Sequence, residues 1–131
     1  VYFVRQFRVG AEKEMLELPA GVMDEGEDPL STAHRELQEE IGRDASHLER
    51  IGGFYMAAGY TSEYMHVFFA SNLSEHSLDQ DEDEFLSLVK VDVREVFGMI
   101  KSGQVEDGKT ISAFLLAMPT LNELLLSSNV L

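Results

Sequence analysis

The stretch from Gly21 to Gly42, GVMDEGEDPLSTAHRELQEEIG, decides how the rest of the chain is interpreted. Residues 20–27 contain two glycines and three acids without an apolar period, which predicts a loop. Asp28 and Pro29 then predict a helix start, because Asp is a favoured N-cap and Pro is tolerated at the first helical position. Gly42 is a matching helix end. Apolar residues at helical spacing give this helix one side that faces a core: Leu30, Ala33, Leu37 and Ile41.

Three carboxylates lie beside that apolar side. Glu36, Glu39 and Glu40 are three and four residues apart, so they occupy an arc of roughly 100° on the helix. Such carboxylates repel one another by about 0.2–0.5 kcal/mol per pair. The helix contains only Arg35 as a compensating cation, and hard divalent cations are the natural alternative. Taken alone, the cluster could equally be an acidic, solvated surface helix.

The composition describes one globular domain. The length is 131 residues and 44% of them are hydrophobic, which suits a single core. The net charge of −14 argues against nucleic-acid or anionic-membrane partners. Cysteine is absent, which fits a cytoplasmic protein. Polar residues and Pro119 interrupt the Leu-rich run 111–126, so we expect a packed core helix with a break there and no membrane span.

Other elements follow from periodicity and from breaker residues. Strands are expected at 1–8, 14–18, 51–58, 65–70 and 86–91, with the turn 59–63 making a hairpin of the third and fourth. Helices are expected from Val93 to Ser102 and from about Thr110 to Met118. Helices and strands mix without regular alternation, so the fold class is α/β (α+β). Because the chain begins within a strand, we expect a trimmed N-terminus.

The spacing of fixed residues in the first stretch resembles the signature of the Nudix hydrolase family. The matching positions are Gly21, Glu27, Arg35-Glu36-Leu37, Glu39-Glu40 and Gly42. Arg43 departs from it, because the family usually has an aliphatic residue there. The resemblance implies a single Nudix domain over residues 1–131, with a mixed β-sheet sandwiched between helices.

Further segments resemble the ADP-ribose pyrophosphatase branch: Leu18-Pro19-Ala20-Gly21, residues 59–63, residues 82–85 and Asp107-Gly108-Lys109-Thr110. The branch implies Mg²⁺-dependent hydrolysis of ADP-ribose to AMP and ribose 5-phosphate, with Mn²⁺ as a possible substitute. Ala58 stands where many members of the branch have proline, so GDP-mannose or another sugar nucleotide remains open. A non-catalytic ADP-ribose sensor is a third reading, although every glutamate of the signature is retained.

The resemblance also implies roles for individual residues. The implied metal ligands are the carbonyl of Ala20 and the carboxylates of Glu36, Glu39, Glu40 and Glu84. Glu82 is the implied general base, with Glu84 as the alternative, and Glu39 is the second implied catalytic carboxylate. On residue type alone, Glu82 and Glu84 would be an exposed acidic loop.

The remaining matched positions have implied structural or binding roles. Glu27 and Arg35 would hold the loop against the helix, and Gly21 and Gly42 complete the motif. Arg8 is an implied phosphate contact, since a guanidinium binds phosphate with two parallel hydrogen bonds. Glu63 is an implied sugar contact, although an ordinary surface arginine and turn residue are the alternatives. Members of this branch are commonly dimers, so a homodimer is expected.

Overall fold

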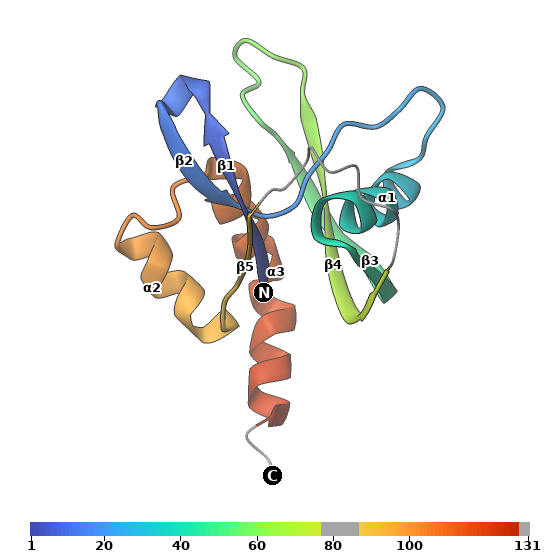
Figure 1. Ribbon diagram of the computed structural model, residues 1–131, viewed down its shortest axis with the longest axis vertical. Helices are drawn as coiled ribbons and strands as arrows, with labels where there is room; N and C mark the ends of the chain where they lie inside the picture. Colours follow the sequence, from blue (N-terminus) through green and yellow to red (C-terminus); the bar gives the residue numbers. More distant parts are fainter. Residues whose placement is uncertain (77–86, 129–131) are drawn as a thin grey trace.

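The computed structural model describes residues 1–76 and 87–128. Two antiparallel sheets contain its strands (Figure 1). The first has the order β2-β1-β5 and consists of β1 (Tyr2–Arg8), β2 (Lys13–Glu17) and β5 (Ser87–Lys90). The second is the hairpin of β3 (Arg43–Tyr55) and β4 (Tyr64–Glu75). The helices are α1 (Pro29–Ile41), α2 (Val96–Lys101) and α3 (Gly108–Ser128), with short 3₁₀ turns at Val9–Ala11 and Val93–Glu95.

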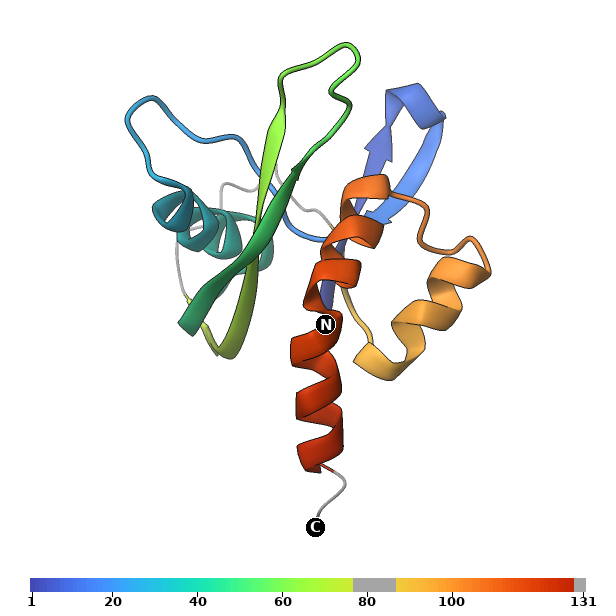
Figure 2. The same cartoon turned by 180° about the vertical axis from the view of Figure 1, so that it is seen from behind.

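The helices lie on opposite sides of the strands. Helix α1 lies against the hairpin on the near side in Figure 1, whereas α3 runs along the far side and faces the viewer in Figure 2. Helix α2 flanks the three-stranded sheet. The α+β fold class is therefore confirmed. In the described ranges, every strand pair is antiparallel, so the expected mixed sheet takes the form of two antiparallel sheets.

Helix α1 begins and ends where the sequence predicts. The Asp28 carboxylate accepts hydrogen bonds from the amides of Leu30 and Ser31, at 3.0 and 3.1 Å, and Pro29 is the first helical residue. Gly42 closes the helix in the left-handed conformation, with φ 61°, which glycine adopts without a Cβ penalty. Both ends of the acidic helix are thus fixed by local chemistry.

The hairpin is longer than expected. Strands at 51–58 and 65–70 were expected, whereas β3 already begins at Arg43 and β4 continues to Glu75. The missed segments are rich in polar residues that face solvent, which hides a strand from hydrophobic periodicity. A register shift between Arg50 and Gly52 bends β3 beside α3. The other three strands lie close to their expected bounds.

The expectation of a broken C-terminal helix is wrong. Helix α3 runs without interruption from Gly108 to Ser128, through Pro119. Pro119 removes the hydrogen bond to the carbonyl of Leu115, and both residues are exposed, so water can satisfy that carbonyl. By length and composition, Gly108–Ser127 could also cross a membrane. Its first half is core, as expected, while Leu126 in the second half is 70% exposed.

The main core lies between the three-stranded sheet, α2 and α3. Its buried members are Phe3, Leu16, Val96, Val105 and Phe114. The rings of Phe3 and Phe114 stack with centroids 5.9 Å apart, joining β1 to α3. This packing holds the start of α3 against the ends of β1 and β2, beside the loop that leads into α1.

Candidate active site

The loop after β2 lies against the side of α1 that carries Glu36, Glu39 and Glu40, which we call the acidic edge. The amide of Ala20 donates a hydrogen bond to Glu40 Oε2 at 2.9 Å. A Cβ atom on Gly21 would overlap the Glu36 carboxylate, so residue 21 must be glycine if Glu36 keeps this position. The Ala20–Gly21 backbone thus lies beside two of the three carboxylates, and the two parts of the motif meet in space.

Arg35 is the centre of the other half of this edge. Its guanidinium donates to both carboxylate oxygens of Glu27 at 3.0 Å, and to Glu36 at 2.7 Å and Glu39 at 2.9 Å. It also donates to the Val22 carbonyl at 3.0 Å. Hydrogen bonds from Arg35 and Thr32 lower the pKa of Glu27 to about 2. Hydrogen bonds from Arg35 to Glu27 and to the Val22 carbonyl thus connect the loop to the helix.

Among the described residues, no cation is hydrogen-bonded to Glu40, although the nearby charge of Lys109 acts to lower its pKa. Burial raises the pKa of Glu40 to about 7; the Ala20 amide opposes this shift and the nearby charge of Glu36 adds to it. Burial also raises the pKa of Glu36, although Arg35 opposes the shift. Glu40 is therefore a partly buried carboxylate whose negative charge is poorly compensated.

The carboxylates do not converge on one point. In residues 1–76 and 87–128, no group of three histidine, aspartate, glutamate or cysteine side chains could hold a metal ion. Arg35 draws Glu36 and Glu39 toward itself, while Glu40 is held by the Ala20 amide. The implied base Glu82 and the implied ligand Glu84 lie outside the described residues.

The donor set nevertheless fits a hard divalent cation. Its members offer carboxylate and carbonyl oxygen, which Mg²⁺ prefers. Burial is the main cause of the raised pKa of Glu40, and a cation bound beside this carboxylate would favour its charged form.

Arg8 belongs to an ion-pair network around the buried carboxylate of Glu17. It donates from Nε and Nη2 to the two carboxylate oxygens of Glu17, both at 2.7 Å. Lys109 donates to Glu17 and, at 2.9 Å, to Asp107. Sequence analysis assigned no role to Glu17 or Lys109. The Asp107–Thr110 motif was a signal for Lys109, because it places a lysine at the start of α3.

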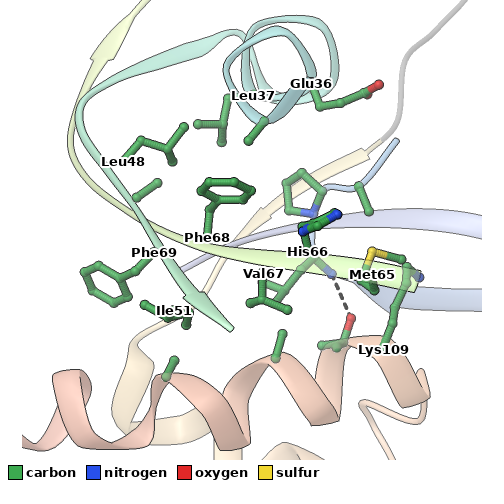
Figure 3. A pocket seen from close by; sticks show the side chains of 18 of the residues that line it. Glu36, Leu37, Leu48, Ile51, Met65, His66, Val67, Phe68, Phe69 and Lys109 are labelled. Carbon is green, nitrogen blue, oxygen red and sulfur yellow. Dashed lines mark hydrogen bonds between the residues drawn. The ribbon is translucent and has the colours of Figure 1, made fainter. Parts of the chain in front are cut away.

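A cleft of about 800 Å³ is lined by α1, α3, the hairpin and the loop after β2 (Figure 3). Its lining includes the charged residues Glu36 and Lys109. Strand β4 supplies apolar lining, with Phe68 on the side of Leu37 and with Val67 and Phe69 on the opposite side of the strand. The Ala20–Gly21 backbone and Glu63 also line it. The structure therefore places the loop, α1 and Glu63 around one cavity, with Arg8 next to it through Glu17 and Lys109.

A Nudix fold with a complete signature helix is the class that this architecture defines. Residues 1–114 match the NUDIX domain family, and the chain belongs to that family.

Known proteins of this family resemble most of the chain. It is 40% identical over 115 residues to the ADP-ribose pyrophosphatase of Bacillus subtilis (strain 168), covering 86% of this chain and 62% of that protein. It is 30% identical over 120 residues to a GDP-mannose pyrophosphatase of Yersinia enterocolitica, covering 85% and 62%. A crystal structure of an ADP compounds hydrolase superposes with a TM-score of 0.84 at 30% identity, covering 93% of this chain and 66% of that one. The chain thus spans 62% of the length of both curated relatives.

Proposed function

We propose that this chain hydrolyses the diphosphate linkage of a nucleoside-diphosphate sugar, with ADP-ribose as the first substrate to test. The observation that carries the proposal is the contact between the Ala20–Gly21 backbone and the carboxylates of Glu36 and Glu40. It assembles the family's signature loop and helix into one acidic edge beside a cleft. The similarity to an ADP-ribose pyrophosphatase supports the same substrate class.

Residues at this edge would hold the divalent cations that Nudix hydrolases generally use. We assign Glu36, Glu39, Glu40 and the Ala20 carbonyl as ligands, together with Glu84. Bound there, the cations would neutralise the diphosphate and lower the pKa of a bound water. We name Mg²⁺ as the ion, with Mn²⁺ as its substitute.

The resemblance to the family is the basis for the roles of the remaining residues. Glu82 accepts a proton from the attacking water, with Glu84 as the alternative base. The water oxygen bonds to one phosphorus atom while the bond from that phosphorus to the bridging oxygen breaks. The products from ADP-ribose are AMP and ribose 5-phosphate. Glu63 lines the cleft, where a carboxylate can accept a hydrogen bond from a sugar hydroxyl.

The second candidate substrate is GDP-mannose, which the similarity to GDP-mannose pyrophosphatases favours. A non-catalytic sensor is not favoured, because Glu36, Glu39 and Glu40 are all present on α1. We further propose that the protein is cytoplasmic and forms a homodimer, which gel filtration with light scattering would test.

A panel assay tests the function. Purified protein is incubated with ADP-ribose, GDP-mannose and other nucleoside-diphosphate sugars, with Mg²⁺, Mn²⁺ or EDTA, and the released phosphomonoesters are measured with phosphatase. We expect metal-dependent release that is highest with ADP-ribose. Greater release from GDP-mannose would make GDP-mannose the preferred substrate in place of ADP-ribose. Metal-dependent binding without release from any compound would favour the non-catalytic sensor.

A further inference from the structure

Glu17 is a buried charge that the proposed chemistry does not use. It is the last residue of β2, directly before the loop that reaches Glu36 and Glu40, and it is 1% exposed. A buried carboxylate is costly unless it is fully paired and hydrogen-bonded. Its partners therefore show what the position is for.

Two cations share this carboxylate. Arg8 binds it from the side, Nε to Oε1 and Nη2 to Oε2, both at 2.7 Å, and Lys109 donates to Oε2. Burial alone would raise the pKa of Glu17, but the hydrogen bonds from Arg8 and Lys109 outweigh it and hold the pKa below its usual value. Lys109 is also paired with Asp107, so the network combines two cations with two carboxylates.

The side-on contact fixes how Arg8 faces solvent. A guanidinium is planar and rigid, so holding the Nε–Nη2 edge also fixes the direction of Nη1. The Arg8 side chain is 45% exposed, and among the described residues no protein acceptor is assigned to Nη1. Donors of a fixed geometry are thus left for an external anion.

The same network reaches the loop of the candidate site. Lys109 donates to Asp107 at 2.9 Å, and Asp107 accepts from the Thr110 hydroxyl at 2.6 Å. That hydroxyl accepts from the Leu18 amide at 2.9 Å. Glu40 also contributes to the raised pKa of Arg8, so the guanidinium lies within electrostatic reach of the acidic edge.

We propose that Glu17 is a positioning residue for Arg8, which it orients so that Nη1 faces the diphosphate of the substrate. The proposal rests on the function proposed above, because it needs a diphosphate-bearing ligand at the acidic edge. Glu17 itself touches no substrate. Lys109 supports it as the second cation on the buried carboxylate.

A double-mutant cycle separates positioning from a merely structural role. The four proteins are the wild type, Glu17→Gln, Arg8→Lys and the double variant, assayed for kcat and KM with ADP-ribose and Mg²⁺. Arg8→Lys keeps the charge but loses the rigid fork. Glu14→Gln, which alters an exposed carboxylate on the same strand, is the control and should leave KM unchanged.

We expect each single variant to raise KM by about tenfold, the size of one charge-assisted hydrogen bond, with a smaller change in kcat. The KM of the double variant should be no higher than the KM of either single variant. If Glu17→Gln raised KM by the same factor in the wild type and in the Arg8→Lys variant, the proposal would be overturned. If Glu17→Gln fails to fold in urea titrations, Glu17→Asp takes its place, since it keeps the charge but cannot reach both nitrogens.

Failure of the proposed function would be visible separately. If the wild type cleaves no diphosphate compound in the panel, the same four proteins are titrated calorimetrically with ADP. Weaker ADP binding that is non-additive between residues 8 and 17 would support the positioning role even then. Unchanged binding in Glu17→Gln would overturn it.

Discussion

The acidic edge of α1 has two halves, the carboxylates around Arg35 and the carboxylate of Glu40, and their negative charges are stabilised to different extents. Around Arg35, the carboxylates of Glu27, Glu36 and Glu39 all receive hydrogen bonds from one guanidinium, and the pKa of Glu27 falls to about 2. One turn further on, Glu40 has a single amide donor and a pKa raised to about 7. Arg35 compensates the carboxylates of the first half, whereas burial raises the pKa of the carboxylate in the second.

The difference distinguishes, within one motif, carboxylates that hold the structure together from a carboxylate that is proposed to bind metal. Where the protein supplies its own cation, a carboxylate is held in place and its charge is compensated. Where burial outweighs the nearby positive charge, as at Glu40, the ionised form is disfavoured. Glu36 belongs to both halves, since it contacts Arg35 but has a raised pKa.

The largest expected effect comes from removing the charge of Glu40. Glu40→Gln should lower kcat at least about a hundredfold, because an implied metal ligand loses its charge. Steady-state assays with Mg²⁺ measure it, and Glu49→Gln, an exposed carboxylate on β3, is the control. Wild-type turnover in Glu40→Gln would remove the distinction between the two halves.

Gly21→Ala tests the contact that joins loop and helix. Its Cβ would overlap the Glu36 carboxylate, so Glu36 or the loop must move. We expect turnover to fall by about tenfold, since small displacements of catalytic groups are costly. Gly10→Ala is a matched control, because a Cβ there meets no atom within 4 Å. Equal effects of the two substitutions would argue against a role for the contact.

A smaller effect concerns the pH dependence of stability without metal. The pKa of Glu40 is raised in the folded state from 4.5 to about 7, so its stabilising contribution is complete below pH 4.5 and is lost as the pH rises through 7. After allowance for solvent screening, the loss amounts to about 1 kcal/mol. Urea unfolding in EDTA at pH 5 and pH 8 should show it in the wild type but not in Glu40→Gln. If the free energy of unfolding changed equally between pH 5 and pH 8 in the wild type and in Glu40→Gln, the raised pKa of Glu40 would be contradicted.

The smallest effect belongs to the half around Arg35. The pKa of Glu27 is lowered in the folded state, so its contribution is present above pH 4.5 and is lost as the pH falls toward 2. Glu27→Gln should lower the urea midpoint at pH 7, and the difference from wild type should narrow in acid. A difference that stays constant down to pH 2 would show that the hydrogen bonds act independently of the charge.

The sequence predicted local features well and three-dimensional arrangement poorly. Asp28, Pro29 and Gly42 act within one turn of chain, so both ends of α1 were predictable. The early start of β3 at Arg43 was missed, because its pairing with β4 is set by partners distant in the chain. Pro119 ended the expected helix, yet the structure continues it, because exposure of the preceding turn depends on tertiary packing.

The candidate site shows the same division. The acidic edge was predictable, since one helix fixes the spacing of Glu36, Glu39 and Glu40. The hydrogen-bond partners of Arg35 were not predictable, because the guanidinium can reach several carboxylates. Glu17 was missed, since a charged residue in an alternating strand predicts exposure, whereas its burial depends on cations from β1 and α3.

The β3–β4 hairpin joins the signature helix at Gly42 and turns at residues 56–63, at its far end. The helix is capped independently at both termini, so the length and composition of that turn can change without displacing the acidic edge. Glu63, at the end of the turn, lines the cleft. If the proposed function is right, exchange of this loop between relatives would be a route to new sugar selectivity, and the turn is the segment that a directed-evolution library should diversify first.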